Sequence, residues 1–149
     1  MKKKLEREWK KAFESDLSHI CYEIRDLIKT PAMVLVEGEM GAGKTTFCKT
    51  FIGNEDTLSP TYSLIYETSK ALHADLYRLE GPEDLIHLEL PMYLEGKDFF
   101  LVEWGEKYAN QLNNILSEEH SCYLLEVVID DSESNTSRSY HFYSIDLNT

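Results

Sequence analysis

Gly38-Glu39-Met40-Gly41-Ala42-Gly43-Lys44-Thr45 satisfies the pattern G-x-x-x-x-G-K-[ST] in full. Glycines in such a segment permit positive φ angles and let the chain wrap closely around phosphate oxygens. Successive N–H groups then point inward, and the positive end of the following helix strengthens the field. We expect Lys44 to reach the β- and γ-phosphates of ATP and the Thr45 hydroxyl to ligate Mg²⁺. The segment therefore predicts a binding site for ATP with magnesium. We expect the next residue, Thr46, to bind the nucleotide as well.

The surroundings of this segment fit the same interpretation. An apolar run at residues 33–36 is typical of a buried parallel strand and leads directly into the loop. A helix is expected from the end of the loop to about Ile52, with Gly53-Asn54 as its C-cap. A chance glycine-rich turn has no reason to lie between a strand and a helix, so this context favours the phosphate-binding loop.

The rest of the chain reads as alternating strands and helices. Strands are expected at residues 64–67, 72–75 and 99–102 and in a C-terminal hairpin at 121–145; helices at 17–28, 82–88, 91–94 and around 108–115. Residues 5–13 fit either a helix or a short edge strand. This order predicts one P-loop ATPase domain over residues 1–149, an α/β three-layer sandwich with a mostly parallel central sheet and antiparallel edge strands.

Composition narrows the class of protein. The chain has 149 residues and a net charge of −12, but residues 1–11 carry six Lys or Arg against two Glu, so the remainder carries −16. Such an acidic body argues against a broad nucleic-acid surface. The basic segment 1–11 could touch RNA or an acidic partner, but such a run is more often a solvated end. No run approaches the ~18 apolar residues of a membrane span, so a cytoplasmic location without membrane contact is expected. The three cysteines lack metal-ligand spacing, which favours reduced thiols near the core.

Two acids are candidates for the magnesium shell. Glu103 follows the apolar run 99–102, and Asp75 closes residues 71–75, so both are expected at the carboxyl edge of the sheet, where α/β proteins bind ligands. Asp75 alone could equally be a solvated turn acid. His73 alone is typical of a partly buried structural histidine. Ser59-Pro60-Thr61-Tyr62 lies in a predicted loop after the P-loop helix, where Thr61 could contact magnesium or the γ-phosphate.

In this order, four segments resemble the TsaE family, the ATPase subunit of the bacterial machinery for threonylcarbamoyladenosine in tRNA. They are Glu37–Thr46 in its full sequence EGEMGAGKTT, Ser59-Pro60-Thr61-Tyr62, His73-Ala74-Asp75-Leu76-Tyr77-Arg78-Leu79, and Glu103-Trp104-Gly105-Glu106. The resemblance covers roughly residues 15–110. It implies that Asp75 and Glu103 are functional acids, that Thr61 lies in a switch-like loop, and that Trp104 borders the nucleotide. It also implies partners: a threonylcarbamoyl-transferase subunit and its dimerising paralogue, similar to TsaD and TsaB, with tRNA met only through that complex. Gly105 departs from the proline usual in the family, and the hairpin matches only in outline.

The expected reaction is ATP hydrolysis, with Lys44, Asp75 and Glu103 as its catalytic residues. The chain has four arginines, of which only Arg78 lies in a motif, so a transition-state arginine is scarce and turnover by the isolated chain should be slow. Two alternatives stay open: a small-molecule kinase of the nucleotide or shikimate type, whose arginine-rich lid this sequence lacks, and a noncatalytic nucleotide-binding interaction module.

Overall fold

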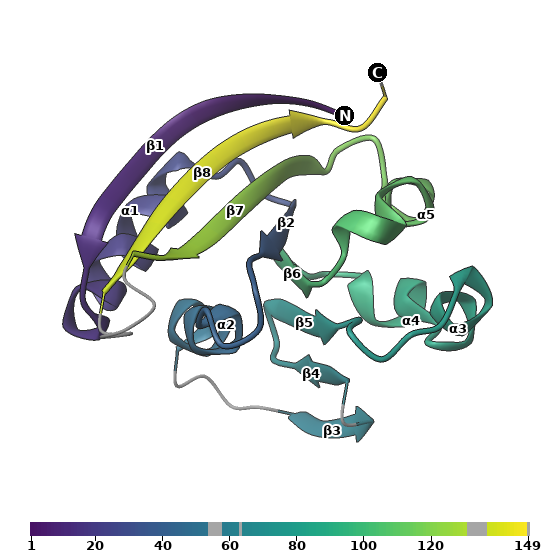
Figure 1. Cartoon of the computed structure of the whole chain (residues 1–149). Helices are drawn as coiled ribbons and strands as arrows, with labels where there is room; N and C mark the ends of the chain where they lie inside the picture. Colours follow the sequence, from purple (N-terminus) through teal and green to yellow (C-terminus); the bar gives the residue numbers. More distant parts are fainter. Residues whose placement is uncertain (54–57, 63, 131–136, 149) are drawn as a thin grey trace.

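The computed structural model describes residues 1–53, 58–62, 64–130 and 137–148, and its strands form one mixed sheet with helices on both faces (Figure 1). The strands are β1 (Lys2–Ala12), β2 (Ala32–Glu37), β3 (Leu58–Tyr62), β4 (Ile65–Glu67), β5 (Ala71–Asp75), β6 (Phe99–Glu103), β7 (Ser121–Ile129) and β8 (Arg138–Asp146). The helices are η1 (Glu14–Asp16), α1 (Leu17–Leu27), α2 (Lys44–Ile52), α3 (Pro82–His87), α4 (Leu90–Leu94), η2 (Glu106–Tyr108) and α5 (Ala109–Ile115).

The sheet has a parallel centre and antiparallel edges. Its described strands run in the order β1-β8-β7-β2-β6-β5-β4-β3. β2 pairs in parallel with β6 and β7, and β6 pairs in parallel with β5. The hairpins β7–β8 and β4–β5, extended by β1 and β3, make the two antiparallel edges. The predicted α/β class with a mostly parallel centre is therefore confirmed.

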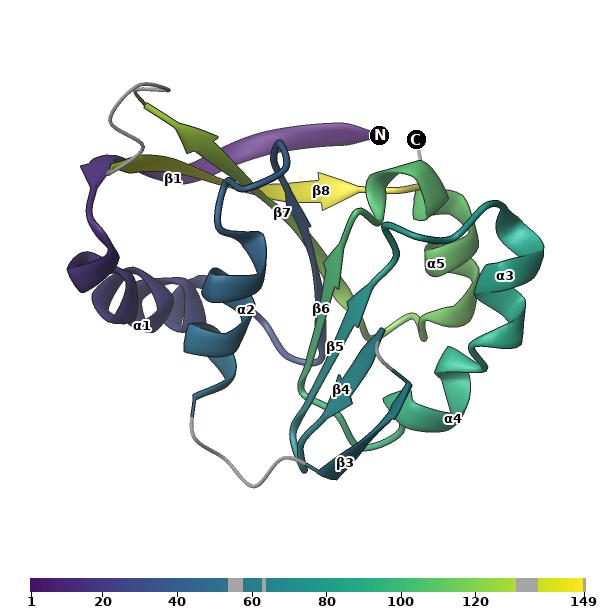
Figure 2. The ribbon, with the colours of Figure 1, turned by 60° about the horizontal axis from the view of Figure 1, so that its bottom comes forward.

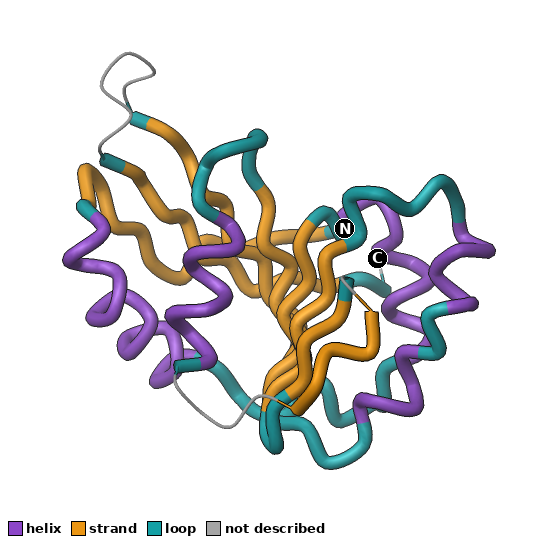
Figure 3. The backbone as a smooth tube through the Cα atoms, turned by 90° about the horizontal axis from the view of Figure 1, so that it is seen from below, coloured by secondary structure: helices purple, strands orange, loops and turns teal. Residues whose placement is uncertain are grey.

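Helices cover the two faces of the sheet in separate groups, with α1 and α2 on one side and α3, α4 and α5 on the other (Figures 2 and 3). The central strand β2 is buried from Ala32 to Val36 because both of its faces are covered. Val34 and Val36 belong to the core beneath α1 and α2, whereas Met33 and Leu35 belong to the core beneath α3 to α5. This explains why a continuous apolar run, without alternation, encodes the strand.

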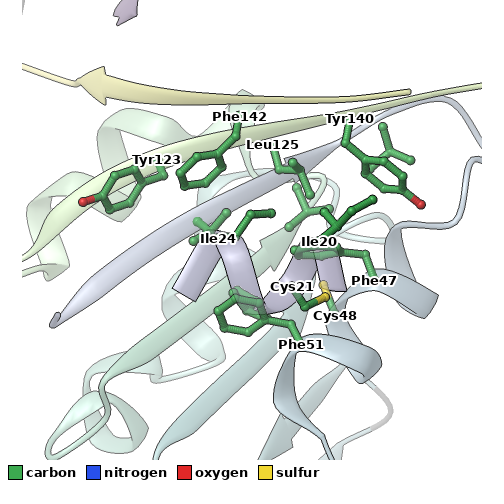
Figure 4. Close-up of a cluster of buried hydrophobic side chains, with 14 of the residues drawn as sticks. Ile20, Cys21, Ile24, Phe47, Cys48, Phe51, Tyr123, Leu125, Tyr140 and Phe142 are labelled. Atoms are coloured by element: carbon green, nitrogen blue, oxygen red, sulfur yellow. The ribbon is translucent and has the colours of Figure 1, made fainter. Parts of the chain in front are cut away.

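The core beneath α1 and α2 holds those helices in place. Ile20 and Ile24 of α1 and Phe47 of α2 point toward the aromatic residues of β8 (Figure 4). The ring of Phe47 lies 6.5 Å from that of Tyr140. Because α2 begins at Lys44, its packing against this core fixes where the phosphate loop ends.

The structure decides two local expectations from the sequence. Of the two alternatives for residues 5–13, the strand is correct, because β1 pairs with β8 over most of its length. The expected loop containing residues 59–62 is wrong, since these residues lie in the edge strand β3. None of the helices in the described residues combines the length and apolar character that crossing a bilayer requires.

Candidate nucleotide site

Residues 38–43 connect β2 to α2, so the loop crosses the carboxyl edge of the parallel strands. Gly41 and Gly43 have φ angles of 81° and 106°, which a residue with a Cβ rarely adopts. Gly38 is required for another reason: a Cβ there would lie 2.5 Å from the carbonyl oxygen of Val127 in β7. The glycines of the motif thus serve both the turn of the loop and its close approach to the sheet.

Lys44, the first residue of α2, has a buried side chain that closes this loop. Only 5% of Lys44 is exposed, and its Nζ donates hydrogen bonds to the carbonyl oxygens of Gly38 at 2.6 Å and Glu39 at 3.0 Å. The same ammonium group lies 4.2 Å from the centre of the Trp104 ring, which adds a cation–π contact. The charge is therefore held at the mouth of the loop, where phosphate oxygens would be attracted to it.

Acidic groups surround that charge. Burial is the main reason why the pKa of Lys44 is lowered, while Glu103, Glu37 and Asp75 act in the opposite direction. Glu37, the last residue of β2, accepts a hydrogen bond from the Gly105 N–H at 3.3 Å. Burial raises the pKa of the Glu37 carboxyl to about 7. The lysine thus stands among carboxylates, one of which is protonated to a substantial degree near neutral pH.

Thr45 and Glu103 meet across the edge of the sheet. The Thr45 Oγ1 lies 2.9 Å and 3.0 Å from the two carboxylate oxygens of Glu103, to which its hydroxyl donates. Asp75 pairs with Glu103 in the register of β5 and β6, so both acids end neighbouring parallel strands. Its Oδ1 accepts a hydrogen bond from the Tyr77 N–H at 3.0 Å. Hydroxyl and carboxylate oxygens are the donors that magnesium prefers, so this group of residues fits that ion.

These residues line a cavity of about 310 Å³, which we call the Trp104 cavity. Its lining consists of Met40, Gly41, Gly43, Lys44, Thr45, Thr46, Asp75, Tyr77, Glu103 and Trp104. Trp104 has a φ of 59°, unusual for a residue with a side chain, and its ring lies 5.0 Å from that of Tyr77. The two rings form one wall of the cavity beside Lys44.

A second cavity, the Arg138 cavity, lies on the other side of the loop and measures about 230 Å³. Its lining consists of Glu14, Leu17, Gly41, Ala42, Gly43, Thr46, Arg138 and Tyr140. The Arg138 side chain donates to the carbonyl oxygens of Ala42 at 2.7 Å and Gly41 at 3.3 Å. Arg138 thereby links β8 to the phosphate loop. Nothing in the local sequence around Arg138 signals this contact, which depends on the pairing of β8 in the sheet.

His73 was expected to be partly buried, and that expectation is wrong. Only 2% of His73 is exposed, as is 2% of Glu103, and the His73 Nε2 lies 2.6 Å from the Glu103 Oε2. The reason is its position in β5, which packs between β4 and β6 with both faces covered. The H-x-D spacing is the sequence signal that His73 faces the same side of the sheet as the predicted acid Asp75, because side chains two residues apart on a strand lie on the same face.

The remaining predicted residues differ in their surroundings. Glu39 and Met40 are exposed at the tip of the loop, Met40 at 61%, whereas Ala42 is buried. Thr46 borders both cavities. Thr61 lies in β3, but its side chain is outside the described part of the structure.

A larger cavity of about 460 Å³ lies between α5, β7 and the end of β8; it shares no residue with the loop and carries no part of this site.

A parallel sheet, a glycine loop that leads into α2, the buried Lys44 and the paired Thr45 and Glu103 together define a P-loop NTPase. The family described as "Threonylcarbamoyl adenosine biosynthesis protein TsaE" matches residues 11–139. Because this match covers most of the sequence, the chain belongs to the TsaE family.

Individual relatives carry the same description. A "tRNA threonylcarbamoyladenosine biosynthesis protein TsaE" of Rickettsia felis is 33% identical over 137 residues, covering 82% of this chain and 80% of the relative. One of Rickettsia prowazekii is 41% identical over 100 residues, covering 61% of this chain and 69% of the relative. The structure titled "Crystal structure of Bacillus subtilus YdiB" superimposes with a TM-score of 0.63 at 20% identity, covering 99% of this chain and 90% of that one, which shows a shared fold.

Proposed function

We propose that this chain is the ATP-binding, slowly ATP-hydrolysing subunit of the machinery that forms threonylcarbamoyladenosine in tRNA. One observation carries the proposal: the Thr45 hydroxyl lies within 3.0 Å of both Glu103 oxygens, beside a complete phosphate loop closed by Lys44. A hydroxyl and an acid in this arrangement are the groups that hold magnesium next to a bound triphosphate. The family membership supports the tRNA part of the proposal.

The two cavities suggest how ATP would lie. Gly41, Gly43 and Thr46 border both of them, so a phosphate chain held by the loop could extend into each. The Trp104 cavity contains the acids and Lys44 and suits the γ-phosphate end. The Arg138 cavity offers Leu17 and the Tyr140 ring, which suit the nucleoside end of the ligand.

Each residue then has a definite task in hydrolysis, in which water attacks the γ-phosphorus and its bond to ADP breaks. Lys44 would attract the phosphate oxygens, and Thr45 with Glu103 would hold magnesium, either directly or through water. Bound magnesium would neutralise charge on the phosphoryl oxygens. Asp75, whose carboxylate is oriented by the Tyr77 N–H, would order water at the same edge. Trp104 and Tyr77 would exclude bulk water from one side.

Few arginines are available to stabilise the transition state. Arg7 pairs with Glu23 at 3.2 Å, Arg25 donates to the Phe51 carbonyl, and Arg138 is bound to the loop carbonyls. Arg78, which follows Tyr77 in the sequence motif, is exposed. A missing arginine finger can lower the rate ~10³–10⁵-fold. We therefore propose that the isolated chain turns over slowly and is stimulated by a threonylcarbamoyl-transferase subunit and its dimerising paralogue.

A steady-state ATPase assay, with each component added singly and in combination, tests this proposal. We expect slow turnover by the chain alone, a large increase with the transferase complex, and little change with tRNA alone. Glu103→Gln and Asp75→Asn should retain nucleotide binding and lose most of the stimulated rate. Fast turnover by the isolated chain, or full stimulation by bare tRNA, would show that the division of tasks is different.

A further inference from the structure

We propose that His73 is a positioning residue that holds the Glu103 carboxylate in its metal-binding orientation. This inference rests on the proposed function, because it concerns magnesium at the Thr45 and Glu103 site. The His73 Nε2 lies 2.6 Å from the Glu103 Oε2, and both residues are only 2% exposed. His73 lines neither the Trp104 cavity nor the Arg138 cavity, so it would act only through Glu103.

Glutamate needs such help more than aspartate would. Its side chain has one more rotatable bond, so a Glu at the end of a strand can point its carboxylate in more directions. In this site the carboxylate is fixed from two sides: the Thr45 hydroxyl contacts both oxygens, and His73 contacts one of them. If magnesium recruits the Thr45 hydroxyl, the contact from Thr45 changes, and among the described residues His73 is the other side chain hydrogen-bonded to the Glu103 carboxylate.

The histidine is itself held rigidly. Its ring stacks on that of Tyr66 in β4, with centroids 5.7 Å apart and an angle of 26° between the planes. Cys48 of α2 lies behind the pair, with its sulfur within 4.8 Å of the ligand atoms of His73 and Glu103. Complete burial raises the pKa of the Cys48 thiol well above its usual range, so this neighbour is uncharged. A hydrogen bond in such a dry environment is strong and directional.

Two amide substitutions form a matched pair for the test. The amide nitrogen of His73→Gln can occupy the place of Nε2, whereas that of His73→Asn reaches only the place of Nδ1. The measurement is the binding of a fluorescent ATP analogue to the isolated chain as a function of magnesium concentration. We expect His73→Asn to raise the half-saturating magnesium concentration roughly 10- to 100-fold, as partners of metal ligands commonly do. His73→Gln should stay within about threefold of wild type, and magnesium-free ADP binding should change little in either variant.

A double-mutant cycle shows whether the effect passes through Glu103. In the Glu103→Gln background, His73→Asn should cause no further rise in the half-saturating magnesium concentration. His141→Asn, on β8, is the control for loss of a histidine elsewhere in the sheet. Equal magnesium dependence in the wild type, His73→Asn and His73→Gln would overturn the inference, as would a full effect of His73→Asn in the Glu103→Gln background. If nucleotide binding by the wild-type chain does not depend on magnesium concentration, the proposed metal site is overturned as well.

Discussion

At the scale of single residues, the site depends on Lys44 and on the carboxylates around it. Lys44 is bonded to two carbonyl oxygens of its own loop, so part of its role is to shape the loop before any phosphate arrives. The sequence predicts the loop itself because its chemistry resides in adjacent residues. It does not predict the contacts of His73 or Arg138, since each depends on strands that are distant along the chain. The functions of Asp75, Glu103, Thr61 and Trp104 stay predictions.

Lys44→Ala is expected to abolish tight ATP binding. The substitution removes a charge-assisted contact to phosphate, with a cost on the order of 2–5 kcal/mol, which corresponds to roughly 30- to 5,000-fold in affinity. Calorimetric titration with ATP and magnesium measures it, with Lys49→Ala on the exposed face of α2 as the control. Affinity of the Lys44 variant within threefold of wild type, at an unchanged melting temperature, would rule out the P-loop assignment.

Glu37 predicts a dependence of stability on pH. Its pKa is raised from the ordinary 4.5 to about 7, chiefly by burial. A carboxyl with a raised pKa binds more protons in the folded state, so its contribution is complete below pH 4.5 and is lost as the pH rises through 7. Glu37→Gln cannot ionise and keeps an oxygen for the Gly105 N–H. Between pH 4.5 and 8, its free energy of unfolding should rise relative to wild type by on the order of 1–3 kcal/mol.

Urea unfolding of wild type and Glu37→Gln at a series of pH values checks this prediction. Glu39→Gln, an exposed neighbour, is the control and should follow the wild-type curve. Parallel curves for all three proteins would mean that Glu37 ionises as readily in the folded chain as in the unfolded one.

At the scale of elements, the predicted strands and helices agree with the structure where periodicity is strong. β2 and β6 are apolar runs bounded by clear signals, and α1 has apolar residues at helical spacing. β1 and β3 are less evident because each is an edge strand with one neighbouring strand, so its residue types are weakly constrained. β1 is mostly charged, with Leu5, Trp9 and Ala12 as its apolar residues, and the strand exists mainly because β8 offers backbone partners.

Gly38 links two of these elements. A Cβ at this position would meet the Val127 carbonyl at 2.5 Å, so Gly38→Ala must displace either the loop or β7. We expect a loss of about 1–3 kcal/mol in the free energy of unfolding, as for other overpacked sites. Gly81→Ala is the matched control, because nothing lies within 4 Å of the Cβ it would add. Equal stability of the two variants would show that the loop adjusts without cost.

At the scale of the whole molecule, the fold class follows from the order of the elements, but the arrangement of its charge does not. The net charge is −12, and the six basic residues of segment 1–11 are exposed to solvent, as expected, but they lie in the edge strand β1. Some of them are engaged within the chain: Lys3 lies 3.9 Å from Glu126 and Arg7 lies 3.2 Å from Glu23. The acidic body therefore dominates the long-range field of the protein.

This field predicts that association with the proposed partner, the transferase complex, depends on salt. Attraction between an acidic surface and a basic partner speeds the encounter and is screened by salt. We expect the association rate constant, measured by stopped-flow or surface plasmon resonance, to fall about tenfold or more between low and high ionic strength. The dissociation rate constant should change less. Direct tRNA binding by the isolated chain should be weak at physiological salt, and tight binding would contradict the prediction.

The pairing of β1 with β8 has a consequence for biosynthesis. The ribosome makes β1 long before β8, the strand that pairs with it, with Lys2 opposite Asp146. At typical elongation rates of 5–20 residues per second, β1 waits roughly 6–25 s for that partner. During this time its unpaired edge is open to other nascent chains. Its many lysines keep it hydrated and repel a second copy, which suits a segment that must stay unpaired until β8 has been made.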